Sequence, residues 1–325
     1  MRALIQEDYG EPRDVLSVGE VPDPTPGDDE VHVRVHAASI HIGDVHGIRG
    51  VPYLFRPIYG LRGPKVPIPG TDISGTVEAV GPNVTEFAPG DDVFGWCTSA
   101  FAESVVTSAD TLASKPAGLS FEKAAALGVS AMVALQALRD YGTLQPGQRV
   151  LINGASGGVG TFAVQIAKAL GAEVSAVCST RNLELVSSIG ADHVIDYTKE
   201  DFTQGEQRYD LILDNVGTRS LAETRRALET DGRLLSNGAP TGGWTRPLGR
   251  IIRVLASSLV VREQARPVVH AYRASDLLAL AELVAAGQLS PVVDLAATLD
   301  EGANAVGHVA DGHAQGTTVI TMRRG

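Results

Sequence analysis

Cysteine and long apolar runs are scarce in this chain of 325 residues. Its two cysteines, Cys97 and Cys178, exclude a disulfide framework and a cysteine-rich zinc site. No stretch approaches the roughly 18 uninterrupted apolar residues that a membrane-spanning helix needs. The opening residues, MRALIQEDYG, also lack the basic start and apolar run of a signal peptide. We therefore expect a cytoplasmic protein without a membrane partner.

Positive charge is scarce as well. The 27 Lys and Arg residues are outnumbered by 38 Asp and Glu residues, which gives a formal net charge of −11. Binding to nucleic acid requires a basic face that neutralises phosphates, so nucleic acid is not an expected partner. Because domains hold roughly 100–200 residues each, the length predicts two domains, both large enough to bury a core.

The first part of the chain has the pattern of a mainly β domain. Apolar and polar residues alternate from Val31 to Val35, which is the period-two pattern of a half-buried strand. Prolines recur between residues 52 and 89, a density that fits short strands and turns. From Phe121 the pattern becomes that of one helix, with Ser120 as its N-cap and Gly142 as its end.

From Arg149 onward, short apolar strands alternate with helical segments. The predicted strands are RVLIN, EVSAVC, HVIDY, DLILDNV and GRLLSNG. Alternating β and α units of this length predict an α/β fold with a doubly wound parallel sheet. After about Arg262 the chain is expected to return to the first domain through the helix SDLLALAELVAAG and the strand TTVITM.

The segment NGASGGVG, residues 153–160, lies between the first of these strands and a helix. Pyrophosphate binding requires a tight turn and free N–H groups at a helix N-terminus. Gly157 would let the backbone approach the phosphates, and Gly160 would let the helix pack closely. Aligned on G-x-G-x-x-G, the segment has Ala155 in place of the first glycine. A plain glycine-rich turn is the alternative, but the strand–loop–helix setting favours a dinucleotide site formed by Ala155, Ser156, Gly157, Gly158 and Val159.

The end of the second strand in this region predicts which dinucleotide binds. Enzymes that use NAD usually carry Asp or Glu there, whereas this chain reads Cys178-Ser179-Thr180-Arg181-Asn182. Ser179 and Arg181 can donate hydrogen bonds to a 2′-phosphate, so we expect NADPH. Alternatively, Arg181 is a solvated residue at a helix start. Tyr197 either packs against the adenine or is a strand-end aromatic.

Several motifs, in order along nearly the whole chain, resemble the zinc-free quinone oxidoreductase branch of the medium-chain dehydrogenase/reductase superfamily. They are Ala37-Ala38-Ser39 running into Asp44, VPIPGTDISGTVEAVGPNVTEFAPGDDVFG, FAESVV, NGASGGVGTFAVQIAKALGA and GADHVIDY. The resemblance implies a GroES-like substrate domain at residues 1–123 and 264–325 and a Rossmann domain at 124–263. It also implies bound NADPH, a quinone or α,β-unsaturated carbonyl substrate, and a homodimer.

The same resemblance argues against a catalytic zinc. Zinc alcohol dehydrogenases of the superfamily place a Cys where this chain has His41, a His where it has Thr71, and a further Cys near Val129. A catalytic zinc needs three protein ligands, and only one of these positions offers one. His41 also departs from the zinc-free relatives, which usually carry Asn beside the nicotinamide. It either alters substrate choice or is a tolerated exchange.

Further residues follow from the resemblance. Ser130 is expected near the nicotinamide ribose, with Asn215 and Gly238 after the fourth and fifth strands. Their alternative roles are a polar residue at a helix N-terminus, a loop residue and a turn glycine.

For catalysis we expect Tyr53 to orient the substrate carbonyl and His46 or water to supply the proton. In relatives a tyrosine often stands where this chain has Pro52. Asp44 is expected to be ionised unless strongly buried, and to fix its loop by hydrogen bonds. Phe55 and Tyr59 either join Tyr53 in an aromatic substrate wall or belong to the core.

Two other functions fit the same pattern. A binding protein, either an NADPH-dependent sensor or a structural, crystallin-like protein, is possible because no residue is unmistakably catalytic. An enoyl-thioester reductase would need a basic rim for the phosphate of a carrier, and Arg246, Arg250 and Arg253 are candidates for it.

Overall fold

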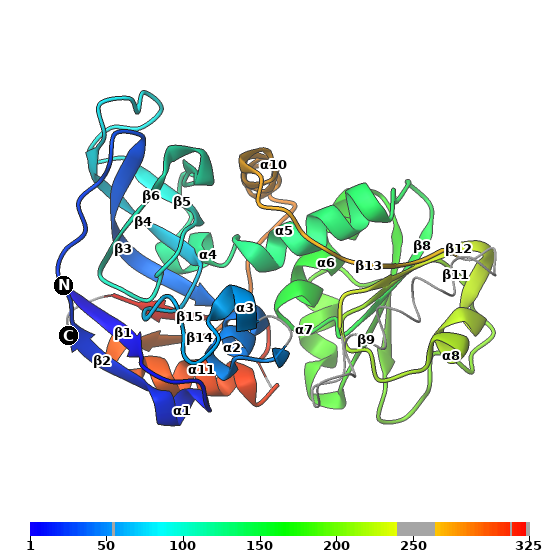
Figure 1. The fold of residues 1–325 in the computed structure, drawn as a ribbon. Helices are drawn as coiled ribbons and strands as arrows, with labels where there is room; N and C mark the ends of the chain where they lie inside the picture. The colour runs from blue at the N-terminus through cyan, green and yellow to red at the C-terminus, as the bar shows by residue number, and fades with distance from the viewer. Residues whose placement is uncertain (54–55, 239–263, 313, 323–325) are drawn as a thin grey trace. The chain divides into compact units, whose positions relative to one another are not determined.

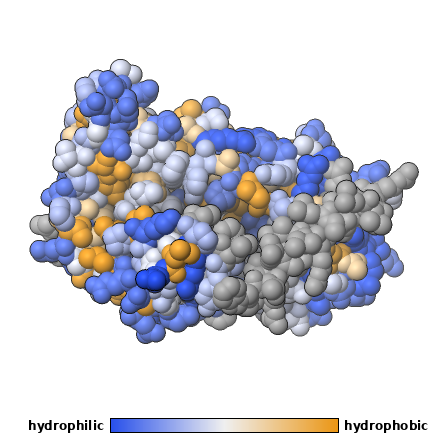
Figure 2. Space-filling view, viewed as in Figure 1, coloured by the Kyte–Doolittle hydropathy of each residue, from blue (hydrophilic) through white to orange (hydrophobic). Residues whose placement is uncertain are grey.

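The computed structural model describes residues 1–53, 56–238, 264–312 and 314–322. The chain forms two compact units, Met1–Met132 with Tyr272–Gly325, and Val133–Ala271. The first is mainly β and the second contains a parallel sheet, as the sequence predicts. No helix in the described residues is long and apolar enough to cross a membrane. On the face shown in Figure 2, apolar groups are scattered among hydrophilic ones.

A seven-stranded sheet forms the centre of the first unit, in the order β14-β15-β3-β4-β5-β7, with β6 also paired to β3 (Figure 1). Its longest strand is β3, whose residues Val31, Val33 and Val35 are at most 2% exposed, so the predicted alternation is confirmed. The strands are β3 (Glu30–Ile40), β4 (Asp72–Val80), β5 (Asp92–Trp96), β6 (Ser104–Ser108), β7 (Leu112–Ser114), β14 (Val293–Thr298) and β15 (Thr317–Thr321).

Smaller elements surround this sheet. The C-terminal strand β15 pairs antiparallel with β3, which confirms that the end of the chain returns to the first unit. The remaining elements are β1 (Arg2–Gln6), β2 (Leu16–Glu20), α1 (Pro12–Val15), α2 (Ile42–Arg49), α3 (Arg56–Tyr59), α4 (Phe121–Ala125), α10 (Ala274–Ala285) and α11 (Gly302–Ala310).

The second unit has a six-stranded sheet of parallel pairs in the order β10-β9-β8-β11-β12-β13. The strand order reverses between β8 and β11, and ligands of such sheets bind beyond the carboxyl ends of the strands at this switch point. The elements are β8 (Arg149–Asn153), β9 (Glu173–Cys178), β10 (His193–Asp196), β11 (Tyr209–Asp214), β12 (Leu228–Ser236), β13 (Gln264–Pro267), α6 (Gly158–Ala169), α7 (Leu183–Ser188) and α8 (Leu221–Arg226).

The predicted single helix after Ser120 is wrong. Ser120 caps α4 as expected, but α4 ends at Ala125 and α5 (Val129–Gln136) begins after a break. The break follows from a distant contact, since the Val129 N–H donates to the Asp72 carboxylate at 2.9 Å. A Cβ on Gly128 would lie 2.2 Å from Asp72 Cγ, so the backbone there must pass close to this carboxylate.

The chain passes from one compact unit to the other after residues 132 and 271, whereas the bounds expected from the sequence are 123/124 and 263/264. These expected domain bounds stay a prediction. At the second change the reason is visible in the sheet: β13 pairs parallel with β12, so residues 264–267 extend the sheet of the second unit.

Candidate active site

In the loop between β8 and α6, Gly154 makes the tight turn. Its φ of 77° lies in the left-handed region, which only glycine adopts at little cost. The N–H groups of Gly154 and Ala155 donate to the Val177 carbonyl at 3.2 and 3.0 Å. Ala155, which replaces the first glycine of the fingerprint, is fully buried and is part of this turn. Ser156 to Val159 form the partly exposed part of the loop.

Gly157 at the end of the loop and Gly160 in the first turn of α6 have different surroundings. A Cβ on Gly160 would lie 2.1 Å from the Gly154 oxygen, so α6 packs against the loop as closely as the sequence predicts. A Cβ on Gly157 would meet only the Gly154 oxygen, at 3.6 Å, which is an ordinary contact. The fold itself therefore tolerates a side chain at residue 157. The open space there lies at the N-terminus of α6, where a dinucleotide pyrophosphate fits.

Asn182 joins this loop to the end of β9, and sequence reasoning missed it. Its Nδ2 donates to Ser156 Oγ at 2.7 Å, which leaves the Ser156 hydroxyl hydrogen directed elsewhere. Asn182 is 4% exposed, and its Oδ1 has no hydrogen-bond partner within the described part of the chain. The contact joins residues 26 positions apart, so no local pattern marks it.

A carboxylate lies close to the end of β9, although the sequence there contains no acidic residue. Ser179 is half-buried and Arg181 is exposed, but Thr180 Oγ1 donates to Asp196 Oδ2 at 2.6 Å. Asp196 belongs to β10, which pairs with β9 and places Asp196 opposite Cys178. Hydrogen bonds, first that from Thr180, lower the pKa of Asp196 to about 2. Tyr197, the next residue, is 58% exposed.

The ends of β11 and β12 meet at the carboxyl edge of the sheet. A Cβ on Gly238 would lie 2.3 Å from the Asn215 carbonyl carbon, so this turn requires glycine. Asn237 Nδ2 donates to Asn215 Oδ1 at 2.8 Å. Asn215 Nδ2 is buried and has no partner among the described residues, and a ligand acceptor would satisfy it. The structure thus brings Asn215 and Gly238 together.

In the first unit, His41 is held in one tautomer. The Gly43 N–H donates to His41 Nδ1 at 3.0 Å, so this nitrogen carries no proton. The Nε2–H then donates to Thr71 Oγ1 at 2.8 Å. Burial lowers the pKa of His41, which favours the neutral ring. His41 is the N-cap of α2. Its comparison with the Asn that zinc-free relatives usually carry did not predict this role.

Two carboxyl groups are buried beside His41. Asp44 Oδ2 accepts from the His41 N–H at 2.9 Å, so Asp44 fixes this loop as predicted. Asp44 is only 7% exposed, and burial raises its pKa to about 7. Asp44 therefore meets the condition of strong burial, under which the sequence does not predict an ionised carboxyl group at neutral pH. Burial also raises the pKa of Asp72 to about 6, and Asp72 accepts from Ser39 Oγ at 3.1 Å.

Ser130 lies on α5 directly after Val129 and is 7% exposed. In the described residues, no three His, Cys, Asp or Glu side chains are arranged to hold a metal ion. The side chains of His41 and Thr71 bond to each other.

The two predicted catalytic residues lie on and after α2. His46 is half-buried, and its pKa is lowered by burial and then by Arg49 and His41. The Arg56 guanidinium lies 4.5 Å from the centre of the Tyr53 ring. Phe55, the side chain of Tyr59, and Arg246, Arg250 and Arg253 lie outside the described residues.

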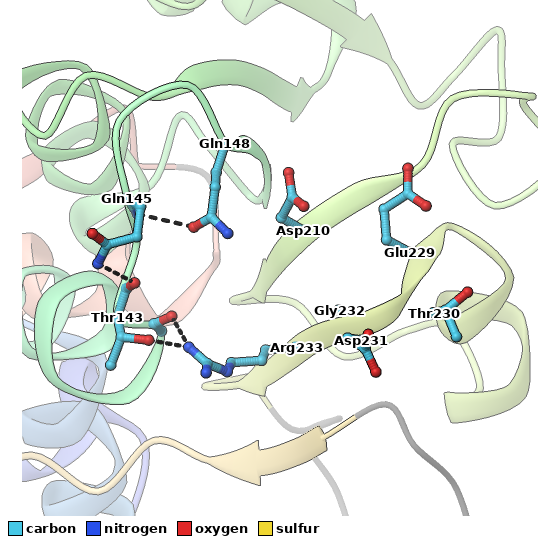
Figure 3. A pocket seen from close by; sticks show the side chains of 10 residues that line it. Thr143, Gln145, Gln148, Asp210, Glu229, Thr230, Asp231, Gly232 and Arg233 are labelled. Atoms are coloured by element: carbon cyan, nitrogen blue, oxygen red, sulfur yellow. Dashed lines mark hydrogen bonds between the residues drawn. The ribbon is translucent and has the colours of Figure 1, made fainter.

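A pocket of about 500 Å³ in the second unit lies away from the carboxyl edge of its own sheet (Figure 3). It lies at the amino ends of β8, β11 and β12, where Asp210, Glu229 and Asp231 contribute to its lining. Arg233 donates across it to the Gly142 carbonyl at 2.6 Å. Because nucleotides bind at the carboxyl ends of such strands, this pocket is not the dinucleotide site.

Comparison with known proteins agrees with this architecture. The alcohol dehydrogenase GroES-like domain family matches residues 27–136, and the zinc-binding dehydrogenase family matches residues 189–320. The mouse protein named NAD(P)H oxidoreductase RTN4IP1, mitochondrial, is 35% identical over 90% of this chain and 82% of its own. The Arabidopsis thaliana chloroplast envelope quinone oxidoreductase homolog is 30% identical over 98% of both. The solved quinone oxidoreductase of Coxiella burnetii superposes with a TM-score of 0.88, at 28% identity and over 99% of each chain.

These likenesses define a two-domain dehydrogenase/reductase fold with a GroES-like and a Rossmann domain. The chain belongs to the medium-chain dehydrogenase/reductase superfamily, in its quinone oxidoreductase branch. Its activity class is that of an NAD(P)H-dependent oxidoreductase.

Proposed function

We propose that the protein is a zinc-independent reductase that transfers hydride from NADPH to a quinone or an α,β-unsaturated carbonyl compound. The observation that carries this proposal is the loop after β8, where Gly157 keeps open a space that the fold itself does not need. Asn215 Nδ2 lies at the same edge of the sheet, and its lack of a partner within the described part of the chain supports a ligand there.

Each part of the dinucleotide has candidate residues. Ser156, Gly157, Gly158 and Val159 would hold the pyrophosphate at the N-terminus of α6. Ser179, Arg181 and Tyr197 would hold the adenosine end, and His41, Ser130, Asn215 and Gly238 the nicotinamide end. When bound, the cofactor supplies the hydride, while the protein orients the acceptor and donates hydrogen bonds to its carbonyl oxygen.

The function is tested by NADPH oxidation with a panel of quinones and enones, using protein dialysed against a strong chelator. We infer zinc independence because Thr71 and Val129 stand at two ligand positions. We expect turnover to survive chelation. Stoichiometric zinc lost together with turnover would contradict this, and tight NADPH binding without turnover would favour a sensor.

The cofactor preference rests on Arg181. We expect wild-type protein to bind NADPH at least about tenfold more tightly than NADH, because charge-assisted bonds to a 2′-phosphate add affinity. Arg181→Ala should erase most of this difference and leave the Kd for NADH nearly unchanged, as measured by calorimetric titration. Arg208→Ala is the charge-matched control, since Arg208 donates only to carbonyls of its own loop among the described residues. If NADH binds as tightly to wild-type protein, Asp196 is the better candidate for the ribose partner.

The proposed role of Tyr53 is to orient the substrate carbonyl. Tyr53→Phe should lower kcat with an enone by about 10- to 100-fold and leave NADPH binding unchanged, because phenylalanine lacks the hydroxyl that would donate to the carbonyl oxygen. His46→Gln tests the alternative proton donor in the same assay. If both variants keep full turnover, neither residue is the acid.

The homodimer and the cytoplasmic location stay predictions. The relatives described above carry names that refer to mitochondria and to the chloroplast envelope, so compartment differs within the family.

A further inference from the structure

The hydroxyl of Thr71 has a defined direction of donation. Because His41 Nδ1 accepts from Gly43, the ring must donate through Nε2, and Thr71 Oγ1 accepts that proton at 2.8 Å. The hydrogen of Thr71 itself therefore points elsewhere. Among the described residues its other partner is Asp72 Oδ1, at a long 3.4 Å. Such a bond is weak and readily exchanged for a better acceptor.

Asp72 lies behind Thr71 as a buried acid. It is 1% exposed, whereas Thr71 is partly exposed. Its Oδ2 accepts from Ser39 Oγ and from the Val129 N–H, which leaves Oδ1 for Thr71. Burial raises the pKa of Asp72 to about 6, so a share of the molecules carries a proton there near neutral pH.

We propose that Thr71 transfers a proton to the reduced acceptor, that Asp72 replaces this proton, and that His41 is the positioning residue that directs the Thr71 hydroxyl. This inference rests on the proposed function. For an enone, hydride and its two electrons come from the reduced nicotinamide and form an enolate. The Thr71 O–H bond then breaks and its proton moves to the enolate oxygen, giving the enol. Thr71 Oγ takes the proton of Asp72 Oδ1, and the remaining Asp72 carboxylate is protonated again from water.

The relay explains why the departure at His41 matters. A hydroxyl oxygen that accepts a strong hydrogen bond from a fixed donor offers its own hydrogen more readily to a developing negative charge. His46 is less suited to this task, because its lowered pKa leaves a neutral imidazole near neutral pH.

The test compares Thr71→Val with Thr71→Ser. Valine keeps the shape and removes the hydroxyl, while serine restores it. We expect Thr71→Val to lower kcat with an enone by about 10- to 100-fold and Thr71→Ser to stay within about threefold of wild type. A solvent isotope effect on kcat should be present in both wild type and Thr71→Ser. The Kd for NADPH and the melting temperature should be similar in all three proteins.

Asp72→Asn tests the acid separately. Wild-type kcat should fall as pH rises through about 6, because the protonated form of Asp72 is required. This fall in kcat with pH should be absent in Asp72→Asn. Within the described ranges, the other titratable groups that interact electrostatically with Asp72 are His41, Asp44 and Cys97. Asp44→Asn should keep this pH dependence but move it to lower pH, because the Asp44 charge raises the pKa of Asp72.

Different results would contradict the relay and the proposed function. Full kcat in a folded Thr71→Val protein would overturn the relay and leave the reductase intact. If the wild-type protein fails to oxidise NADPH with every quinone and enone tested, the proposed function is overturned, and the relay with it.

Discussion

Gly160→Ala should destabilise the nucleotide-binding unit severely, whereas Gly157→Ala should leave its stability unchanged and remove most of its NADPH affinity. At residue 160 the new Cβ would lie 2.1 Å from the Gly154 oxygen and 2.7 Å from Ala155 Cα, and backbone atoms cannot move aside as a flexible side chain can. We expect a loss of about 3 kcal/mol or more, at the upper end for overpacking. The melting temperature should fall by roughly 6–12 °C.

At residue 157 the same methyl group meets its nearest atom at 3.6 Å, so the unliganded fold should accept it. The methyl group would occupy space at the N-terminus of α6 that the pyrophosphate needs, so the Kd for NADPH should rise by about tenfold or more. Thermal melts and calorimetric titration measure the two effects. Gly205→Ala is the control for both, since its Cβ would come no closer than 3.9 Å to another residue. Equal NADPH affinity in Gly157→Ala and wild type would remove the main support for the dinucleotide site.

Asp44→Asn should gain stability relative to wild type as pH rises. The folded protein raises the pKa of Asp44 from 3.8 to about 7 through burial, so the folded state holds this proton more tightly than the unfolded state does. The associated stability is complete below about pH 4 and is lost as pH rises through about 7. Asparagine carries no charge and keeps an oxygen that can accept from the His41 N–H.

The free energy of unfolding of Asp44→Asn, minus that of wild type, should therefore increase by about 2–4 kcal/mol between pH 4 and pH 8. Urea unfolding at these two pH values measures the difference. Asp110→Asn, at an exposed position of the same unit, should follow wild type. A difference that stays constant with pH would show that Asp44 ionises in the folded protein as easily as in the unfolded one.

Sequence patterns predicted those parts of the fold that local rules control. The alternation of Val31 to Val35 marked β3, and the segment at 153–160 marked the strand–loop–helix unit, because both patterns lie within a few consecutive residues. The break between α4 and α5 could not be predicted in this way. It depends on Asp72, which is 57 positions from Val129, so the helical pattern of the segment was continuous while its structure is not.

The candidate site shows the same division. Gly157 and Gly160 stood out because their spacing carries a mechanism. The Asn182 to Ser156 bond and the approach of Asp196 to Thr180 arise from pairing of β9 with its neighbours, and neither has a local signal. The tautomer of His41 cannot be predicted from its residue type, because the tautomer is set by the backbone N–H of Gly43 in the folded loop.

The close contact between His41 and Gly43 should couple the substitutions that evolution accepts at these two positions. A Cβ on Gly43 would lie 2.6 Å from His41 Cε1, so any larger residue at 43 would push the ring away from its cap on α2. Descendants of this chain that exchange Gly43 should also have exchanged His41, and those that keep the histidine should keep the glycine. The two positions are therefore expected to covary, although one of them has no side chain.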